Sequence, residues 1–188
     1  MQHPQPVIPA KAGNFQTIKK IPAFAGMTIR VAKGMSALLE TALPAIAALP
    51  MSLRLMALDL GAKTIGVATA DYTRQLATPR HTIERTKFTL DAQSLIKFAA
   101  AENVGLIVLG LPLNMDDTEG PRCQSTRTFA RNFGKLSPIP IIFWDERLSS
   151  FEADQQMIDA GMRHEKRKAN IDKLAAAIIL QGLLDAVR

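Results

Sequence analysis

The sequence predicts one α/β domain with a mixed five-stranded sheet, in which three antiparallel strands are followed by two parallel strands and helices cover the faces. Three strand-like segments follow one another with short turns, which is typical of an antiparallel meander. Two later apolar segments alternate with helical patterns, which is typical of parallel strands joined by crossovers. The chain has 188 residues, of which 47% are hydrophobic, and this suits a single domain with some surplus.

The meander lies in the first part of the domain. Leu53–Leu60 is a short apolar run bounded by Gly61, as expected for a buried strand. Thr64–Ala70 is rich in β-branched and small residues and forms the next strand after a tight turn. Ala77–Thr82 is expected to form the third strand, so that all three pair antiparallel.

Helices and strands alternate in the second part. Phe88–Ala101 has helical spacing of its apolar residues, and Val104–Leu109 is a continuous apolar run of the kind found in central parallel strands. Pro121, at a first helical position, opens a helix that extends to about Lys135. Ile139–Trp144 is expected to be the last buried strand.

Two helices end the chain. Phe151–Ala160 is expected to be a helix, and Gly161–Lys168, which is charged and begins with glycine, a mobile loop. Ala169–Val187 has the amphipathic pattern of a final helix. The complete order, β-β-β-α-β-α-β-α-α, predicts the ribonuclease H-like arrangement.

The first residues of the chain contain a short repeat. Ile8–Gly13 recurs almost unchanged as Ile21–Gly26. Proline and glycine interrupt both copies, which disfavours a long helix or a strand. Residues 1–34 are therefore expected to be disordered or to result from an upstream start.

Residues 36–50 are more apolar than the segment before them. A secretory signal must be considered, but an acid and a proline interrupt the run, and a short helix packed on the domain is the preferred interpretation. The run is also too short to span a membrane. We therefore divide the chain into an N-terminal extension, residues 1–50, and a ribonuclease H-like domain, residues 51–188.

Cysteine content and charge narrow the function classes. Cys123 is the single cysteine, which excludes an intramolecular disulfide and a cysteine zinc cluster and fits a reducing, cytoplasmic compartment. The three histidines have no metal-ligand spacing, so a metal would be held by carboxylates, which favours Mg²⁺ or Mn²⁺. The net charge is +6, but the first 50 residues hold five of the 23 basic and only one of the 17 acidic residues, so the domain is nearly balanced.

Acidic side chains stand where a site is expected in an α/β fold. Asp59 lies in an apolar strand and is costly to bury unless paired or coordinated, although it could also cap a hairpin turn. Asp145 and Glu146 follow the last strand, where alternation allows one of them to face the site or both to serve a structural ion pair. Asp172 lies early in the last helix and could instead complement its dipole. Together these acids can converge and hold one or two Mg²⁺ for phosphodiester cleavage.

Polar and basic residues near these acids could contact nucleic acid. Pro112–Gly120 leaves the end of a parallel strand and offers amide, hydroxyl and carboxylate groups, or is an ordinary turn. Arg147 could offset the repulsion of the neighbouring acids or contact a phosphate. The basic run Arg163–Lys168 could follow a phosphate backbone or be solvated surface. The candidate nucleic-acid contacts are Lys63, Asn114, Arg147, Arg163, Lys166, Arg167 and Lys168.

Four segments closely resemble the motifs of the YqgF/RuvX family. They are DLGAKTIGVATAD from Asp59, GLPLNMDDTEG from Gly110, DERLSS from Asp145 and NIDKLAAAIILQ from Asn170. The resemblance runs from about Leu55 to Ala186, and four motifs in the family's order make chance agreement improbable. The family comprises bacterial ribonuclease H-like proteins described as pre-16S rRNA nucleases or Holliday junction resolvase homologues.

The resemblance implies a cytoplasmic, metal-dependent nuclease that acts in 5′-end maturation of 16S rRNA. Its partner would be structured RNA, the precursor 16S rRNA of the pre-ribosome, and the protein would be a monomer or a homodimer. By motif position, Asp59, Glu146 and Asp172 match the catalytic acids. The metal ligands would be the same three residues together with Asp145, which the motif leaves as an alternative to Glu146.

This sequence departs from the family pattern at two positions. Thr64 stands where the family often has arginine, which could remove a phosphate contact. Asp117 stands where the family usually has glycine, which could stiffen or reshape the loop. Neither departure removes a candidate metal ligand.

Three other functions compete with rRNA cleavage. Branched DNA is an alternative substrate for the same chemistry, in which case the protein would resolve Holliday junctions as a dimer. The DxGxxxxGVA pattern also occurs in sugar kinases, actin and chaperone ATPases, but those proteins need a second domain that about 135 residues cannot supply. A nucleic-acid-binding module without catalysis is the non-enzyme alternative, and the convergence of three acids speaks against it.

Overall fold

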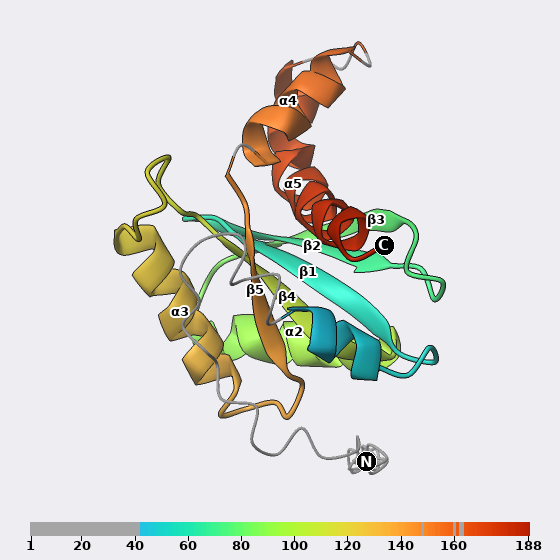
Figure 1. The fold of residues 1–188 in the computed structure, drawn as a ribbon. Helices are drawn as coiled ribbons and strands as arrows, with labels where there is room; N and C mark the ends of the chain where they lie inside the picture. The colour runs from blue at the N-terminus through green and yellow to red at the C-terminus, as the bar shows by residue number, and fades with distance from the viewer. Residues whose placement is uncertain (1–41, 148, 160, 162–163) are drawn as a thin grey trace, which may run out of the picture.

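The computed structural model describes residues 42–147, 149–159, 161 and 164–188, without the side chains of residues 149–152, 154 and 164–169. Five strands form one sheet in the order β3-β2-β1-β4-β5 (Figure 1). They are β1 (Arg54–Leu60), β2 (Thr64–Ala70), β3 (Ala77–Glu84), β4 (Val104–Leu111) and β5 (Ile141–Asp145).

The strand directions agree with the mixed sheet expected from the sequence. β1 pairs antiparallel with β2 and parallel with β4. β2 pairs antiparallel with β3, and β4 pairs parallel with β5. The predicted ribonuclease H-like sheet is confirmed. It brings the carboxyl ends of β1, β4 and β5 to one edge, where α/β proteins gather their functional groups.

Helices cover both faces of the sheet, each over its own apolar core. Because side chains alternate along a strand, β1 sends Met56 and Leu58 to one core and Leu55 and Ala57 to the other. The first core includes α2 (Phe88–Ala101) and α3 (Pro121–Phe133). The second includes α5 (His164–Ala186), against which α4 (Ser149–Asp159) packs, and Figure 1 shows α5 on the face opposite α2.

The last helix begins earlier than expected. The sequence predicts a loop for Gly161–Lys168, but α5 starts at His164 and so includes the charged residues from His164 to Lys168. Lysine and arginine have good helix propensity, so a charged segment can belong to a long helix whose later turns are anchored in a core. That anchor is present, because α5 packs on β1, β2 and β3.

A short helix at residues 42–48 packs on the domain, as expected for the apolar end of the N-terminal extension. Its buried residues Ala42, Ala45 and Ile46 join the second core. Arg74 donates hydrogen bonds to the carbonyl oxygens of Ile46 at 2.8 Å and Pro50 at 3.0 Å, and so ties this segment to the β2–β3 turn. The expectations for residues 1–34 lie outside the described residues. No helix in the described part of the chain is long and apolar enough to cross a membrane.

Candidate active site

Asp59 is a buried acid near the carboxyl end of the central strand. The residue is only 5% exposed. Burial raises its pKa to about 6, and the negative charge of Asp172 adds to this rise, whereas the positive charge of Arg122 opposes it. Burial of an uncompensated carboxylate is costly, and binding of a proton or of a metal cation removes this cost.

Asp145 and Glu146, which the sequence left as alternatives, have different surroundings. The Asp145 carboxylate accepts hydrogen bonds from the backbone N–H of Arg147 at 2.8 Å and from its Nε at 2.7 Å. Glu146 instead interacts electrostatically with Asp59, and burial followed by this repulsion raises its pKa to about 8. Its carboxylate lies over Gly110, where a Cβ atom would overlap Oε2. Glu146 is thus the member of the pair that accompanies Asp59.

Asp172 reaches the same edge from α5. Thr64 Oγ1 donates a hydrogen bond of 2.7 Å to its Oδ2. The Asp172 backbone lies directly over Gly66, because a Cβ atom there would overlap the carbonyl oxygen of Asp172. Gly66 is also the register partner of Asp59 on β1. The close approach that a glycine permits therefore places the helix acid next to the strand acid.

These three acids fit a divalent cation in their chemistry but do not form a closed cage. Asp59 interacts electrostatically with both Glu146 and Asp172, and all three offer carboxylate oxygens, the donors that Mg²⁺ and Mn²⁺ prefer. In the part of the chain that the structure describes, no three histidine, cysteine or acidic side chains converge closely enough to be a ready-made metal site. Asp59 therefore interacts with each of the other two acids, while convergence of all three on one metal ion stays a prediction.

A loop at residues 112–120 is joined to the end of β5 by one arginine. Arg147 Nη1 lies 2.8 Å from Asp117 Oδ1, while the same guanidinium pairs with Asp145. Asp117 has a φ of 63°, a conformation that favours glycine and that aspartate tolerates better than most residues. Asn114 Nδ2 donates to Thr118 Oγ1 at 2.8 Å within the loop. The departure at Asp117 thus supplies an ion pair that holds the loop beside the acids.

The predicted nucleic-acid contacts are scattered around this edge. Lys63 is exposed in the β1–β2 turn, and Asn114 is exposed in the loop. Arg147 is engaged with two carboxylates, which agrees with the first of the two roles considered for it. Arg163 lies outside the described residues. Lys166, Arg167 and Lys168 belong to α5, but their side chains are not described.

Arg122 is a residue of this edge that sequence reasoning missed. It lies in the first turn of α3, and its Nη2 is 3.7 Å from Glu146 Oε1. A single arginine after a proline has no distinctive spacing, and it stands 24 positions before its acidic partner. Its relation to the acids arises only when β4, the loop and β5 are packed side by side.

The raised pKa values predict an unusual dependence of stability on pH for the metal-free protein. Asp59 and Glu146 bind protons more tightly in the folded chain than in the unfolded chain, where acids titrate near pH 4. The stability that this provides is fully present below about pH 4 and is lost as pH rises through about 6 and then about 8. Thermal melts in EDTA should therefore show the melting temperature falling between pH 5 and 9, and saturating Mn²⁺ should reduce the fall. A melting temperature that is flat over this range would contradict the prediction.

Comparison with known proteins agrees with the motif resemblance. A curated relative from Rhodobacter capsulatus, named "Putative pre-16S rRNA nuclease", is 54% identical over 139 residues, covering 74% of this chain and 87% of the relative. A relative from Roseobacter denitrificans with the same name is 52% identical over 153 residues, covering 80% and 94%.

Solved structures with a similar outline include Thermus thermophilus RuvC in complex with a Holliday junction substrate, with a TM-score of 0.44 and 10% identity over 68% of this chain and 91% of that one. Fowlpox virus resolvase with junction DNA has a TM-score of 0.43 and 11% identity over 72% of this chain and 100% of that one. The family model described as "RuvX: Holliday junction resolvase" matches residues 53–186. The match spans most of the chain, and with relatives above 50% identity it shows that the chain belongs to the RuvX family.

Proposed function

We propose that this chain is a divalent-metal-dependent nuclease that cleaves precursor 16S rRNA during maturation of its 5′ end. The family description and the names of the curated relatives both denote nucleases, so the reaction is hydrolysis of a phosphodiester bond. The relatives' name favours precursor rRNA as the substrate. Such a nuclease would act in the bacterial cytoplasm, where ribosomes mature.

The observation that carries the proposal is the pair of buried acids at adjoining strand ends. Burial raises the pKa of both acids, and the charge of Asp59 raises the pKa of Glu146 further, which is unfavourable for the ionised pair in the folded chain unless a cation offsets it. We assign Asp59, Glu146 and Asp172 as the catalytic acids and the metal donors. We propose Mg²⁺ or Mn²⁺ as the ion, because every donor is a carboxylate oxygen.

The side chains around the acids prepare them for this role. A bound cation would supply an activated water and would stabilise charge on the leaving oxygen. Thr64 orients the carboxylate of Asp172 through its hydrogen bond. Arg147 pairs with Asp145 and so leaves Glu146 as the acid directed towards Asp59. The absent side chain of Gly110 leaves the space in which the Glu146 carboxylate lies.

Contacts to the substrate are proposed for the polar and basic groups near the same edge. Lys63 and Asn114 are exposed on turns that follow β1 and β4, and could contact the RNA backbone. Arg147, beside the loop at residues 112–120, is also proposed to contact the RNA backbone. Arg163, Lys166, Arg167 and Lys168 are assigned to the flanking backbone on the basis of sequence.

A second candidate function is resolution of four-way DNA junctions. It is favoured by the description of the matching family model. Paired symmetric cuts require two active sites related by a twofold axis, and therefore a homodimer. A protein that resolves junctions should accordingly be dimeric when bound to them, whereas rRNA cleavage does not demand this.

The test is cleavage of an end-labelled precursor 16S leader beside a labelled four-way junction, each with Mn²⁺ or EDTA. The wild-type chain should cut the RNA only with Mn²⁺, and Asp59→Asn should reduce cleavage at least about 100-fold, the order expected when several kcal/mol of stabilisation by a metal is lost. Preference for the junction would favour the second candidate. Undiminished cleavage by Asp59→Asn, or binding of either substrate without any cleavage, would overturn the assignment.

A further inference from the structure

A cationic side chain from α3 faces the acids at the sheet edge. Arg122 Nη2 lies 3.7 Å from Glu146 Oε1, and its charge also reaches Asp59. The side chain of Arg122 is 68% exposed, whereas that of Glu146 is 7% exposed. The pair therefore has its carboxylate in the protein and its guanidinium on the solvent side, where a substrate would approach.

The guanidinium of Arg122 is available for a further partner. A separation of 3.7 Å exceeds the roughly 2.7–2.9 Å of a charge-assisted hydrogen bond, so its hold on Glu146 is loose. Two neighbouring arginines differ from it. Arg127 pairs with Glu119 and lies over the ring of Phe143 at 4.8 Å. Arg147 pairs with Asp117 and Asp145.

The start of α3 presents this side chain in a suitable position. Gly120 is the N-cap with an extended backbone, Pro121 follows in the first turn, and Arg122 comes next. The free N–H groups of a helix N-terminus add positive potential at the same point. A planar guanidinium can donate two parallel hydrogen bonds to a phosphate, which a lysine cannot do.

We propose that Arg122 is a substrate-contacting residue whose guanidinium pairs with the non-bridging oxygens of the phosphate that is cut. In the substrate-free protein it acts as a counter-ion for Glu146. When the phosphate arrives, the loose pair is exchanged for two hydrogen bonds, and the positive charge stabilises the charge that develops on the phosphate oxygens. The inference rests on the proposed nuclease function. It deepens that function by adding a positively charged side chain to the set of catalytic acids.

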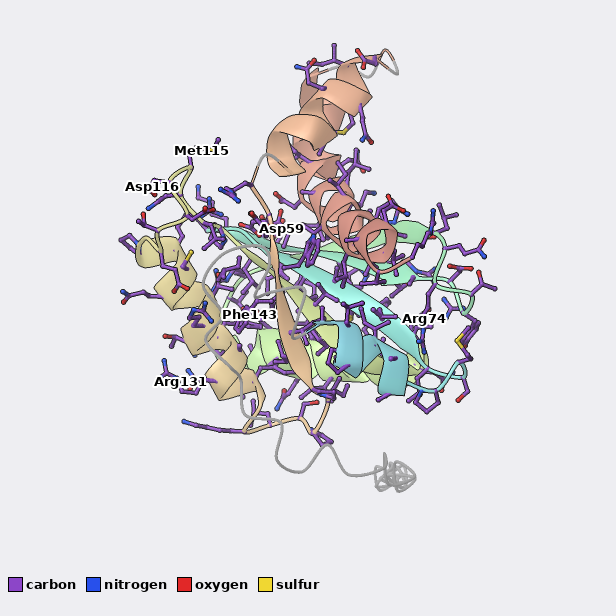
Figure 2. All side chains as sticks on the ribbon, viewed as in Figure 1. Asp59, Arg74, Met115, Asp116, Arg131 and Phe143 are labelled. Atoms are coloured by element: carbon purple, nitrogen blue, oxygen red, sulfur yellow. The ribbon has the colours of Figure 1, made fainter. Side chains whose placement is uncertain are left out.

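The test compares Arg122→Ala and Arg122→Lys with the wild type in cleavage of the labelled precursor 16S leader at saturating Mn²⁺. Arg122→Ala should lower kcat/KM about 100-fold or more, the order seen when one preorganised donor to a developing oxyanion is removed. Arg122→Lys should recover part of this loss, because it keeps the charge without the two-pronged geometry. Arg131→Gln is the matched control, since Arg131 is exposed at the opposite end of α3 (Figure 2) and should stay within about twofold of wild type.

A second readout separates a phosphate contact from a purely structural counter-ion. A counter-ion competes with the cation for Glu146, so its removal would lower the Mn²⁺ concentration needed for half-maximal activity and leave the maximal rate intact. A phosphate contact predicts loss of the maximal rate. It also predicts a salt dependence of RNA binding that is weaker by about one counter-ion in Arg122→Ala.

The outcomes distinguish failure of this inference from failure of the proposed function. Wild-type cleavage that persists in Arg122→Ala, or a full recovery by Arg122→Lys, would overturn the role of Arg122 and leave the nuclease function standing. Absence of cleavage of both the RNA leader and a four-way junction by the wild type would overturn the function, and the inference would fall with it. A melting temperature of Arg122→Ala close to that of the wild type excludes misfolding as the cause of a loss.

Discussion

Replacing Glu146 by glutamine is expected to abolish cleavage while making the metal-free protein more stable at alkaline pH. Glutamine has the shape of glutamate but lacks the charge that a cation needs, so kcat should fall at least about 100-fold. The same change removes a buried negative charge. Burial and the neighbouring charge of Asp59 make this charge unfavourable, and they raise the pKa of Glu146 to about 8. Above that pH the wild-type chain carries the cost of this charge and the variant does not.

Thermal melts in EDTA measure the expected gain in stability of Glu146→Gln over the wild type. At pH 9 the melting temperature of Glu146→Gln should exceed that of the wild type by several degrees, since about 1 kcal/mol corresponds to roughly 2–4 °C in a chain of this size. At pH 5 the wild-type carboxyl is protonated, so the difference should disappear. Glu102→Gln is the matched control. Glu102 pairs with Arg54 and Arg80, and its loss should slightly lower stability at both pH values and leave cleavage intact. A glutamine variant of Glu146 that is less stable than wild type at pH 9 would show that the acid has a structural role.

The strands of the sheet could be predicted from the sequence because burial on both faces produces continuous apolar runs. β1 and β4 are buried along nearly their whole length, and their apolar segments end where the strands do, within two residues. Their order and direction followed from the spacing of turns and helices. The start of α5 could not be predicted in the same way, because the charged residues after Gly161 carry no apolar periodicity. Their helical conformation follows from the long helix that continues behind them.

The acids of the site could be located from the sequence, but their arrangement could not. Asp59 was identified because packing alone does not explain an acid in an apolar strand, and Asp172 because it matches a motif of the family. The choice between Asp145 and Glu146 depends on which acid pairs with Arg147. The sequence allows either acid, and the structure shows that Arg147 pairs with Asp145. Arg122 escaped notice for a related reason, since its partner is brought near only by tertiary packing. The pairing of charges at this edge of the sheet therefore depends on tertiary packing, which the sequence pattern does not reveal.

Gly66 is the residue whose replacement should damage this protein most. Alanine at this position would place a methyl group on the carbonyl carbon and oxygen of Asp172, and within 2.9 Å of the backbone nitrogen of Lys173. These are backbone atoms of a helix packed on three strands, so they cannot move aside as a flexible side chain would. We expect Gly66→Ala to cost about 3 kcal/mol or more, at or above the upper end of ordinary overpacking. Cleavage should be lost as well, because α5 must lift and carry Asp172 away from Asp59.

Gly182→Ala separates this steric effect from the general effect of replacing a glycine by alanine. Gly182 lies in α5, and the nearest atom to its added methyl group would be Trp144 Nε1 at 3.4 Å, an ordinary contact distance. Alanine is favoured over glycine within a helix by about 1 kcal/mol, so this variant should be as stable as the wild type or slightly more stable, with normal cleavage. Urea unfolding and the RNA cleavage assay measure both consequences for the two variants. A Gly66→Ala protein with wild-type stability would mean that α5 does not rest on β2 as described, and the placement of Asp172 beside Asp59 would have to be abandoned with it.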